Sequence, residues 1–209
     1  MKLSIRIAVA AASLLLLAVY VAPLWRIELI APQYPEGLGL RIWVNQITGL
    51  KPNDLNSING LNHYIGMRAI EPEMFPELKV MPWLVAAAVG AGLLVALVGR
   101  RGPLYLLALG AAAGAGAGLY DFHRWGWDYG HHLDEHAAIK VPGMSYEPPL
   151  IGSKQLLNFH ATSWPDVGGW IAIVAVGVIV AAAAIECRRA MRLRTLGSIG
   201  APPEMELSA

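Results

Sequence analysis

Cysteine is nearly absent from this sequence: the chain of 209 residues contains one, Cys187. A single cysteine forms no disulfide within the chain, so no disulfide framework holds the fold together. Cys187 also follows the last apolar run, away from the two long polar segments of the chain. Those segments therefore contain no thiolate ligand, and a metal ion bound there has to use His, Met, carboxylate or backbone groups.

Charged residues are also scarce, at 15% of the chain, whereas 56% of the residues are hydrophobic. A soluble domain usually carries more charge than this. The net charge of +1 gives no indication of a nucleic-acid partner. The charge is unevenly spread as well, because four blocks of about 18 or 19 residues contain no charged side chain: 7–25, 80–98, 103–120 and 167–185.

Each of these blocks has the length of a helix that crosses a membrane. A hydrocarbon core of roughly 30 Å requires about 20 residues at a rise of about 1.5 Å per residue. Four such blocks are difficult to accommodate as buried core helices in so short a chain. The sequence therefore predicts an all-α integral membrane protein with four transmembrane helices, whose two outer loops form a small mixed cap.

Basic residues predict the orientation of these helices. They precede the first block, fill the turn between the second and third, and follow the fourth: Lys2, Arg6, Arg100, Arg101, Arg188, Arg189, Arg192 and Arg194. The long segments 26–79 and 121–166 are balanced or acidic. The positive-inside rule then places both termini in the cytoplasm and both long segments in the periplasm of a bacterial inner membrane.

The predicted organisation follows directly from these blocks. It begins with an N-terminal transmembrane anchor (1–25), an extracytoplasmic segment (26–79) and a transmembrane hairpin (80–120). A second extracytoplasmic segment rich in His and Trp (121–166), a fourth transmembrane helix (167–186) and a basic cytoplasmic tail (187–209) follow. Within the first polar segment we expect an irregular entry at 32–39, a strand at 41–48 and a short helix from Leu55 through Met67.

Glycines in the third block are spaced four residues apart, at Gly110, Gly114 and Gly118. On a helix they share one face, and small residues at this spacing let two helix backbones approach closely in lipid. The predicted partner of this face is the surface around Ala86 and Gly90 on the second helix, or another subunit of a homo-oligomer.

All six histidines lie in the two long polar segments, and five of them lie in 121–166. His63 and Met67 are four residues apart, as are His132 and His136, so each pair projects from one face if the stretch is helical. His131 and Met144 are further candidates in the second segment. Imidazole and thioether groups without a thiolate suit copper, particularly Cu(I), better than zinc or iron. The alternative is that these histidines bind backbone groups or lipid headgroups.

Two stretches carry a resemblance to a known family. Residues 61–67 (Leu-Asn-His-Tyr-Ile-Gly-Met), preceded by 31–39, and the stretch 136–144 (His-Ala-Ala-Ile-Lys-Val-Pro-Gly-Met) resemble small multi-pass bacterial membrane proteins found with copper-handling and nitrous-oxide-reductase accessory genes. The resemblance implies an accessory role in supplying copper to a copper enzyme outside the cytoplasmic membrane. It also implies that His63, Met67, His136 and Met144 are the most important of the candidate copper ligands.

Three functional hypotheses result. In the first, the protein is a non-enzymatic accessory protein or copper chaperone that binds copper through His63, Met67, His131, His132, His136 and Met144, and exchanges it with an extracytoplasmic copper protein. In the second, it is a non-catalytic scaffold or electron-transfer subunit of a larger membrane complex. The third, a membrane enzyme acting on lipid or on a periplasmic substrate, has little support because no nucleophile–base constellation is evident in the sequence.

Overall fold

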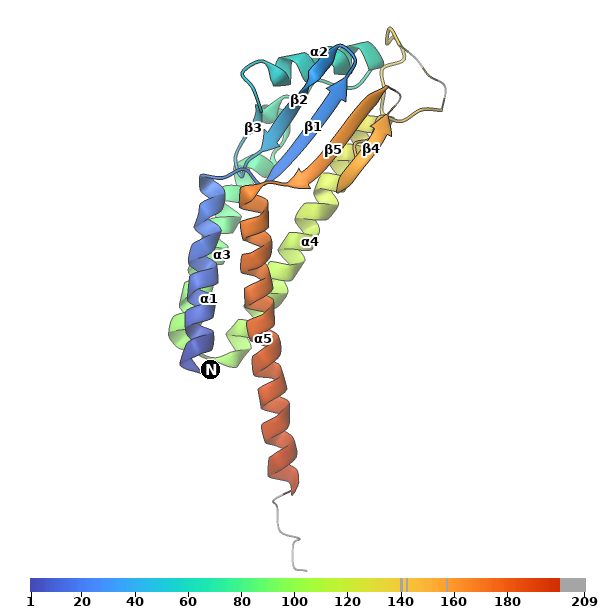
Figure 1. Cartoon of the computed structure of the whole chain (residues 1–209). Coiled ribbons are helices and arrows are strands. Elements are labelled where there is room, and N and C mark those ends of the chain that lie inside the picture. Colours follow the sequence, from blue (N-terminus) through green and yellow to red (C-terminus); the bar gives the residue numbers. More distant parts are fainter. Residues whose placement is uncertain (140, 142, 157, 200–209) are drawn as a thin grey trace, which may run out of the picture.

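Four long helices form one half of the computed structural model, which describes residues 1–139, 141, 143–156 and 158–199 (Figure 1). They are α1 (Leu3–Leu15), extended by the 3-10 turn η1 (Leu16–Tyr20), α3 (Glu77–Val98), α4 (Arg101–His131) and α5 (Val167–Ile199). All four are long and apolar enough to cross a membrane. The four predicted spanning blocks are thus present as helices.

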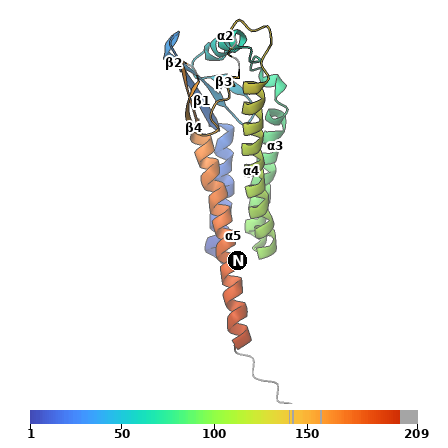
Figure 2. The same ribbon diagram turned by 90° about the vertical axis from the view of Figure 1, so that its right-hand side faces the viewer.

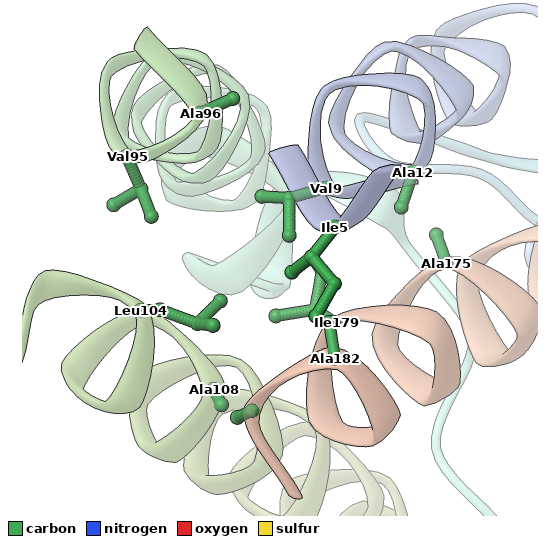
Figure 3. Packing of buried hydrophobic residues seen from close by; sticks show 11 residues of the cluster. Ile5, Val9, Ala12, Val95, Ala96, Leu104, Ala108, Ala175, Ile179 and Ala182 are labelled. Atoms are coloured by element: carbon green, nitrogen blue, oxygen red, sulfur yellow. The ribbon is translucent and has the colours of Figure 1, made fainter. Parts of the chain in front are cut away.

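Small and branched apolar side chains pack the helices together (Figure 3). The buried cluster takes residues from all four helices: Ile5, Val9, Ala12, Val95, Ala96, Leu104, Ala108, Ala175, Ile179, Ala182 and Ala183. α1 and α3 approach closely where the fully buried Ser13 faces Gly92, since a Cβ at Gly92 would overlap the Ser13 side chain. Large apolar residues such as Leu97 and Leu106 point outward and are more than 70% exposed. Side chains of this kind suit a lipid-facing surface.

A five-stranded antiparallel sheet forms most of the other half of the molecule (Figures 1 and 2). Its strands are β1 (Trp25–Ala31), β2 (Tyr34–Ile42), β3 (Ile47–Gly49), β4 (Gly152–Leu156) and β5 (Phe159–Pro165), in the order β3-β2-β1-β5-β4. We call this sheet, with the segments packed on it, the cap. The prediction of an all-α protein is therefore wrong. The central pairing, of β1 with β5, joins the two polar segments. Because these strands are far apart in the sequence, no local sequence pattern predicts that they pair.

The predicted position of the strand in the first polar segment, based on local sequence pattern, is also wrong. The predicted irregular entry at 32–39 lies largely in β2, and the predicted strand at 41–48 is divided between β2 and β3. Pro35 argued against a strand at the position of β2. However, β3 pairs only with Leu40, Arg41 and Ile42 and does not extend to Pro35. The beginning of β2 is therefore a sheet edge, where a residue without an N–H is tolerated.

The cap is completed by α2 (Asp54–Ile65), the 3-10 turn η2 (Pro72–Met74) and the last turns of α4. Its apolar cluster joins the sheet to α2, α3 and α4 through Leu38, Leu40, Ile47, Ile58, Ile70, Leu78 and Tyr129. α4 does not end near residue 120, as the charge pattern suggested, but continues to His131. Its extension carries Trp125 and Tyr129, whose rings contact Phe75.

The glycine face predicted on the third helix makes no close contact with the residues that the structure describes. A Cβ built on Gly90, Gly110, Gly114 or Gly118 would meet no atom within 4 Å. The predicted packing against Ala86 and Gly90 is therefore wrong, because α4 leans away from the bundle toward the cap (Figure 1). Contact with another subunit stays a prediction.

A buried carboxylate ties the helices together at the end opposite the cap. Glu186 of α5 is 1% exposed and contacts Nε of Arg101 at 2.9 Å and Nη1 of Arg189 at 3.5 Å. The backbone N–H of Lys2 also donates to Glu186, at 3.4 Å. Arg6 donates to the carbonyls of Ala96 and Leu97 at 2.6 and 2.7 Å. Sequence reasoning missed Glu186 because it adjoins the basic tail.

Candidate functional site

A hollow of about 420 Å³ opens in the cap where the end of α2 meets the end of α4. Its walls come from two short stretches of the chain, one around the end of α2 and one around the end of α4: His63, Gly66, Met67, Arg68, His131, His132, Leu133 and Asp134. We call it the histidine hollow. Two segments that are far apart in the sequence thus contribute imidazole and thioether groups to one concave surface.

A left-handed glycine shapes the α2 side of the histidine hollow. α2 ends at Ile65, and Gly66 has a φ of +79°, a conformation that glycine adopts without strain. The N–H of Gly66 donates to the His63 carbonyl and that of Met67 to the Asn62 carbonyl, the two hydrogen bonds of a Schellman cap. Met67 therefore leaves the helix axis, and the prediction that α2 continues through Met67 is wrong.

The same glycine anchors the loop that follows α4. The N–H of Asp134 donates to the Gly66 carbonyl at 2.8 Å, and that of Ile139 donates to the Tyr64 carbonyl at 2.9 Å. A Cβ on Gly66 would lie 2.9 Å from both Ala137 Cβ and Asp134 N. The absence of a side chain at Gly66 therefore lets the two walls of the histidine hollow meet.

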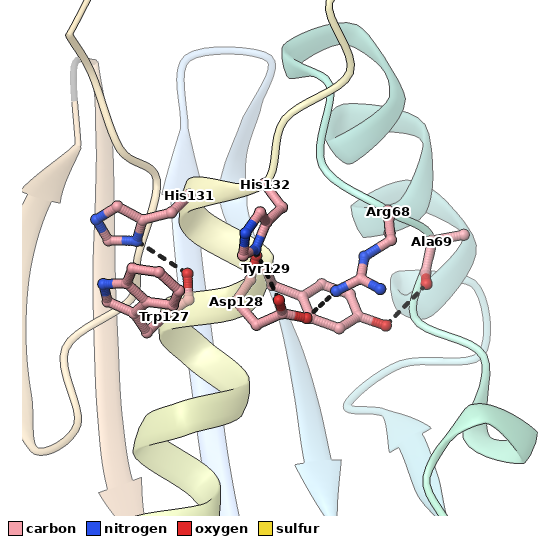
Figure 4. Close-up of polar contacts among 7 residues, drawn as sticks. All are labelled: Arg68, Ala69, Trp127, Asp128, Tyr129, His131 and His132. Carbon is pink, nitrogen blue, oxygen red and sulfur yellow. Dashed lines mark hydrogen bonds and ion pairs between the residues drawn. The ribbon is translucent and has the colours of Figure 1, made fainter.

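His131 and His132 are held by the last turn of α4 (Figure 4). Nδ1 of His131 lies 2.9 Å from the Trp127 carbonyl, and the His131 ring stacks on the Trp127 indole at a centroid distance of 4.7 Å. Nδ1 of His132 lies 2.7 Å from Oδ1 of Asp128. A carbonyl or carboxylate oxygen only accepts, so Nδ1 of each ring is the donor and Nε2 of each neutral ring retains its lone pair.

Asp128 also links the two walls of the histidine hollow. Its second carboxylate oxygen pairs with the guanidinium of Arg68, which lies over the Tyr129 ring at 4.9 Å (Figure 4). The Tyr129 hydroxyl donates to the carbonyl of Ala69 at 3.2 Å. A carboxylate that fixes the tautomer and direction of a neighbouring imidazole is the usual support of a metal-binding histidine.

The predicted ligands divide into two groups. His63, Met67, His131 and His132 line the histidine hollow. His136 and Met144 are not among its lining residues. The side chain of His136 is 92% exposed, and its Nδ1 lies 3.3 Å from Oδ1 of Asp134.

The two remaining histidines also lie away from the histidine hollow. Nδ1 of His123 lies 3.5 Å from Glu147, and His160 is exposed on β5, opposite Gln155 and Ile30.

The described residues include no group of three or more His, Cys, Asp and Glu side chains arranged to hold a metal ion. Methionine is not one of those residue types. A copper ion in the histidine hollow would therefore bind the Met67 thioether together with two of the imidazoles of His63, His131 and His132, and not with all three.

Sequence reasoning missed Arg68 and Trp127 as parts of the site. The role of Arg68 depends on its contact with Asp128 across the two walls, whereas Trp127 contacts His131 within α4. The spacings of Trp127 to His131 and of Asp128 to His132, four residues each, were usable local signals.

Comparisons with known proteins provide no family for this chain. No protein-family model matches it, and no curated protein matches it either.

Proposed function

We propose that this protein is a membrane-anchored accessory protein that binds copper in the histidine hollow and exchanges it with a copper enzyme outside the cytoplasm. The observation that carries the proposal is that His63, Met67, His131 and His132 all line one open concave surface. Two imidazoles and a thioether form a ligand set suited to Cu(I).

The geometry of the histidines supports this proposal. Nδ1 of His131 and of His132 is engaged by Trp127 and Asp128, which leaves Nε2 of each ring available to a metal ion. Cys187 lies on α5, at the end of the molecule opposite the cap, so a thiolate does not compete in this site. The histidine hollow is also open, which favours transfer between proteins over permanent storage.

The direction of transfer and the recipient come from sequence features. The basic ends of the helices lie opposite the cap, and the positive-inside rule therefore predicts a periplasmic position for the histidine hollow. The resemblance of residues 61–67 and 136–144 to proteins of nitrous-oxide-reductase gene clusters makes that copper enzyme the proposed recipient.

The experiment is copper retention by the detergent-purified protein after loading with Cu(I) and desalting. Three double variants are compared with the wild type: His63→Ala/Met67→Ala, His131→Ala/His132→Ala, and the matched control His123→Ala/His160→Ala, which removes two exposed imidazoles outside the histidine hollow. We expect stoichiometric copper in the wild type and the control, and loss in the first two variants. Equal copper in all four proteins contradicts the proposal.

One observation favours the scaffold hypothesis as a second candidate. Every residue of α4 from Ala112 to Tyr120 is exposed, and most of them are Ala or Gly. Lipid-facing helices usually carry larger apolar residues, whereas small residues face other helices. A stable complex with another membrane protein, detected by native mass spectrometry and lost in Gly114→Leu, would support this function.

A further inference from the structure

An exposed pair of arginines lies on α5 just beyond the end of the helix bundle. α5 continues past the ends of α1, α3 and α4 on the side opposite the cap (Figures 1 and 2). Glu186 marks the level where the bundle ends, because it contacts Arg101 at the beginning of α4 and the backbone N–H of Lys2. Arg188 and Arg192 follow two and six residues later, and both are exposed.

The two arginines have no partner of opposite charge. Neither guanidinium forms an ion pair or a hydrogen bond with a residue that the structure describes, whereas Arg101 and Arg189 contact Glu186 at 2.9 and 3.5 Å. Within the described part of this end, Glu186 is the only carboxylate. Arg188 and Arg192 are four residues apart, so they share a helix face and repel each other. A bound anion would remove this repulsion.

The length of α5 places this pair among lipid headgroups. The part from Val167 to Glu186 is about 29 Å long at about 1.5 Å per residue, close to the roughly 30 Å of a hydrocarbon core. Trp170, which is 53% exposed, lies near its other end, and indole rings favour the membrane interface. A headgroup layer is roughly 5 to 8 Å thick on each side. Arg188 therefore lies at the depth of the headgroups, and Arg192 lies at their outer edge.

The face of α5 that carries Arg188 is apolar in the direction of the cap. Ala184, Ala181 and Val174 precede Arg188 by four, seven and fourteen residues, so they lie on the same face, and all three are exposed. A phosphate group held by the arginines therefore has apolar helix surface beside it for attached acyl chains. This arrangement suits a phospholipid better than a soluble anion.

We propose that Arg188 and Arg192 form a binding site for an anionic phospholipid of the cytoplasmic leaflet, with the chemistry of phosphatidylglycerol. Guanidinium groups donate charge-assisted hydrogen bonds to phosphate oxygens in a geometry that matches their planar fork. The headgroup of phosphatidylcholine is neutral overall, because its choline cation offsets the phosphate charge. The site therefore selects the anionic lipid.

The test is lipid binding by the copper-free, full-length protein in detergent, measured by native mass spectrometry during titration with phosphatidylglycerol. Arg188→Gln/Arg192→Gln removes both charges and retains polar side chains. The matched control, Lys51→Gln/Lys154→Gln, removes the same charge from two exposed positions of the cap. Titration of the wild type with phosphatidylcholine tests the requirement for a negative headgroup. Circular dichroism and the thermal midpoint establish that each variant is folded.

We expect the wild type and the control to bind one phosphatidylglycerol with equal affinity. Arg188→Gln/Arg192→Gln should weaken this binding about 10- to 30-fold, the effect of two basic side chains at a membrane surface. Phosphatidylcholine should bind to the wild type at least about tenfold more weakly than phosphatidylglycerol.

Three outcomes would overturn the proposal. The first is unchanged phosphatidylglycerol binding by the folded Arg188→Gln/Arg192→Gln variant, or an equal loss in the cap control. The second is equal affinity of the wild type for the two lipids. The third is displacement of bound phosphatidylglycerol by an excess of inorganic phosphate at constant ionic strength, because it would show that the acyl chains contribute nothing to binding.

Discussion

Substitution of Glu186 by alanine should destabilise the helix bundle more than any other single change to a charged residue at this end of the molecule. The side chain of Glu186 is 1% exposed, and its two oxygens contact Arg101 of α4, Arg189 of α5 and the backbone N–H of Lys2, which precedes α1. Glu186→Ala leaves Arg101 without its carboxylate at 2.9 Å and the Lys2 N–H without its acceptor. Three helices thus lose a shared contact.

The magnitude follows from the burial of the partners. Removing one member of a buried ion pair costs about 3 to 5 kcal/mol when the other member stays buried. The side chain of Arg101 is 41% exposed and that of Arg189 is 36% exposed, so both regain contact with solvent or lipid headgroups. We therefore expect a loss of about 2 to 3 kcal/mol of unfolding free energy, or roughly 4 to 12 °C in the thermal midpoint.

The assay is thermal unfolding in detergent, with two comparison variants. Arg189→Ala removes only the longer contact of 3.5 Å, so its effect should stay below about 1 kcal/mol. Glu135→Ala, at an exposed position of the cap, should have no measurable effect. If Glu186→Ala unfolds within 1 °C of the wild type, the reasoning about this buried carboxylate is refuted.

Three further predictions concern the cap. Asp128→Asn removes the charge that orients His132 at 2.7 Å, so the affinity for Cu(I) should fall about 10- to 100-fold. Competition with a chromogenic chelator measures this affinity, and an unchanged value would rule out the supporting role of Asp128. Gly66→Ala introduces a side chain at a φ of +79° and 2.9 Å from Ala137 Cβ, so it should lower the thermal midpoint, whereas Gly60→Ala, in open space on α2, should not. In intact cells, Cys187 of the wild type should not react with an impermeant maleimide, whereas the cysteine of the double variant Glu135→Cys/Cys187→Ser should react. The reverse pattern would show that the topology is opposite to the proposed one.

The helices of the bundle were predictable because each depends on a local property, a run of uncharged residues long enough to span a membrane. The sheet was not predictable in the same way. β1 and β5 each pair with a neighbouring strand, β2 and β4, but the pairing of β1 with β5 that joins the two hairpins links segments far apart in the sequence. Exposed β4 also contains Ser153, Lys154 and Gln155 without apolar alternation. The apparent end of α4 was misleading because Asp121 marks the end of the apolar block and not the end of the helix.

The histidine hollow was predictable in part. The residue types and the spacing of His63, Met67, His131 and His132 indicated metal ligands, but their grouping into one hollow depends on Gly66 and on the extension of α4. The four-residue spacing led to the prediction that His63 and Met67, and likewise His132 and His136, each lie on one face of a helix. In the structure, α2 ends at Ile65 and α4 ends at His131. His136 and Met144 consequently lie outside the histidine hollow, and their role as ligands stays a prediction.

X-ray absorption at the copper edge of the Cu(I)-loaded protein tests the central claim most directly. We expect one sulfur neighbour from the Met67 thioether together with two imidazole nitrogens, and loss of only the sulfur contribution in Met67→Leu. A copper environment without sulfur in the wild type, or a sulfur signal that persists in Met67→Leu, would contradict binding in the histidine hollow.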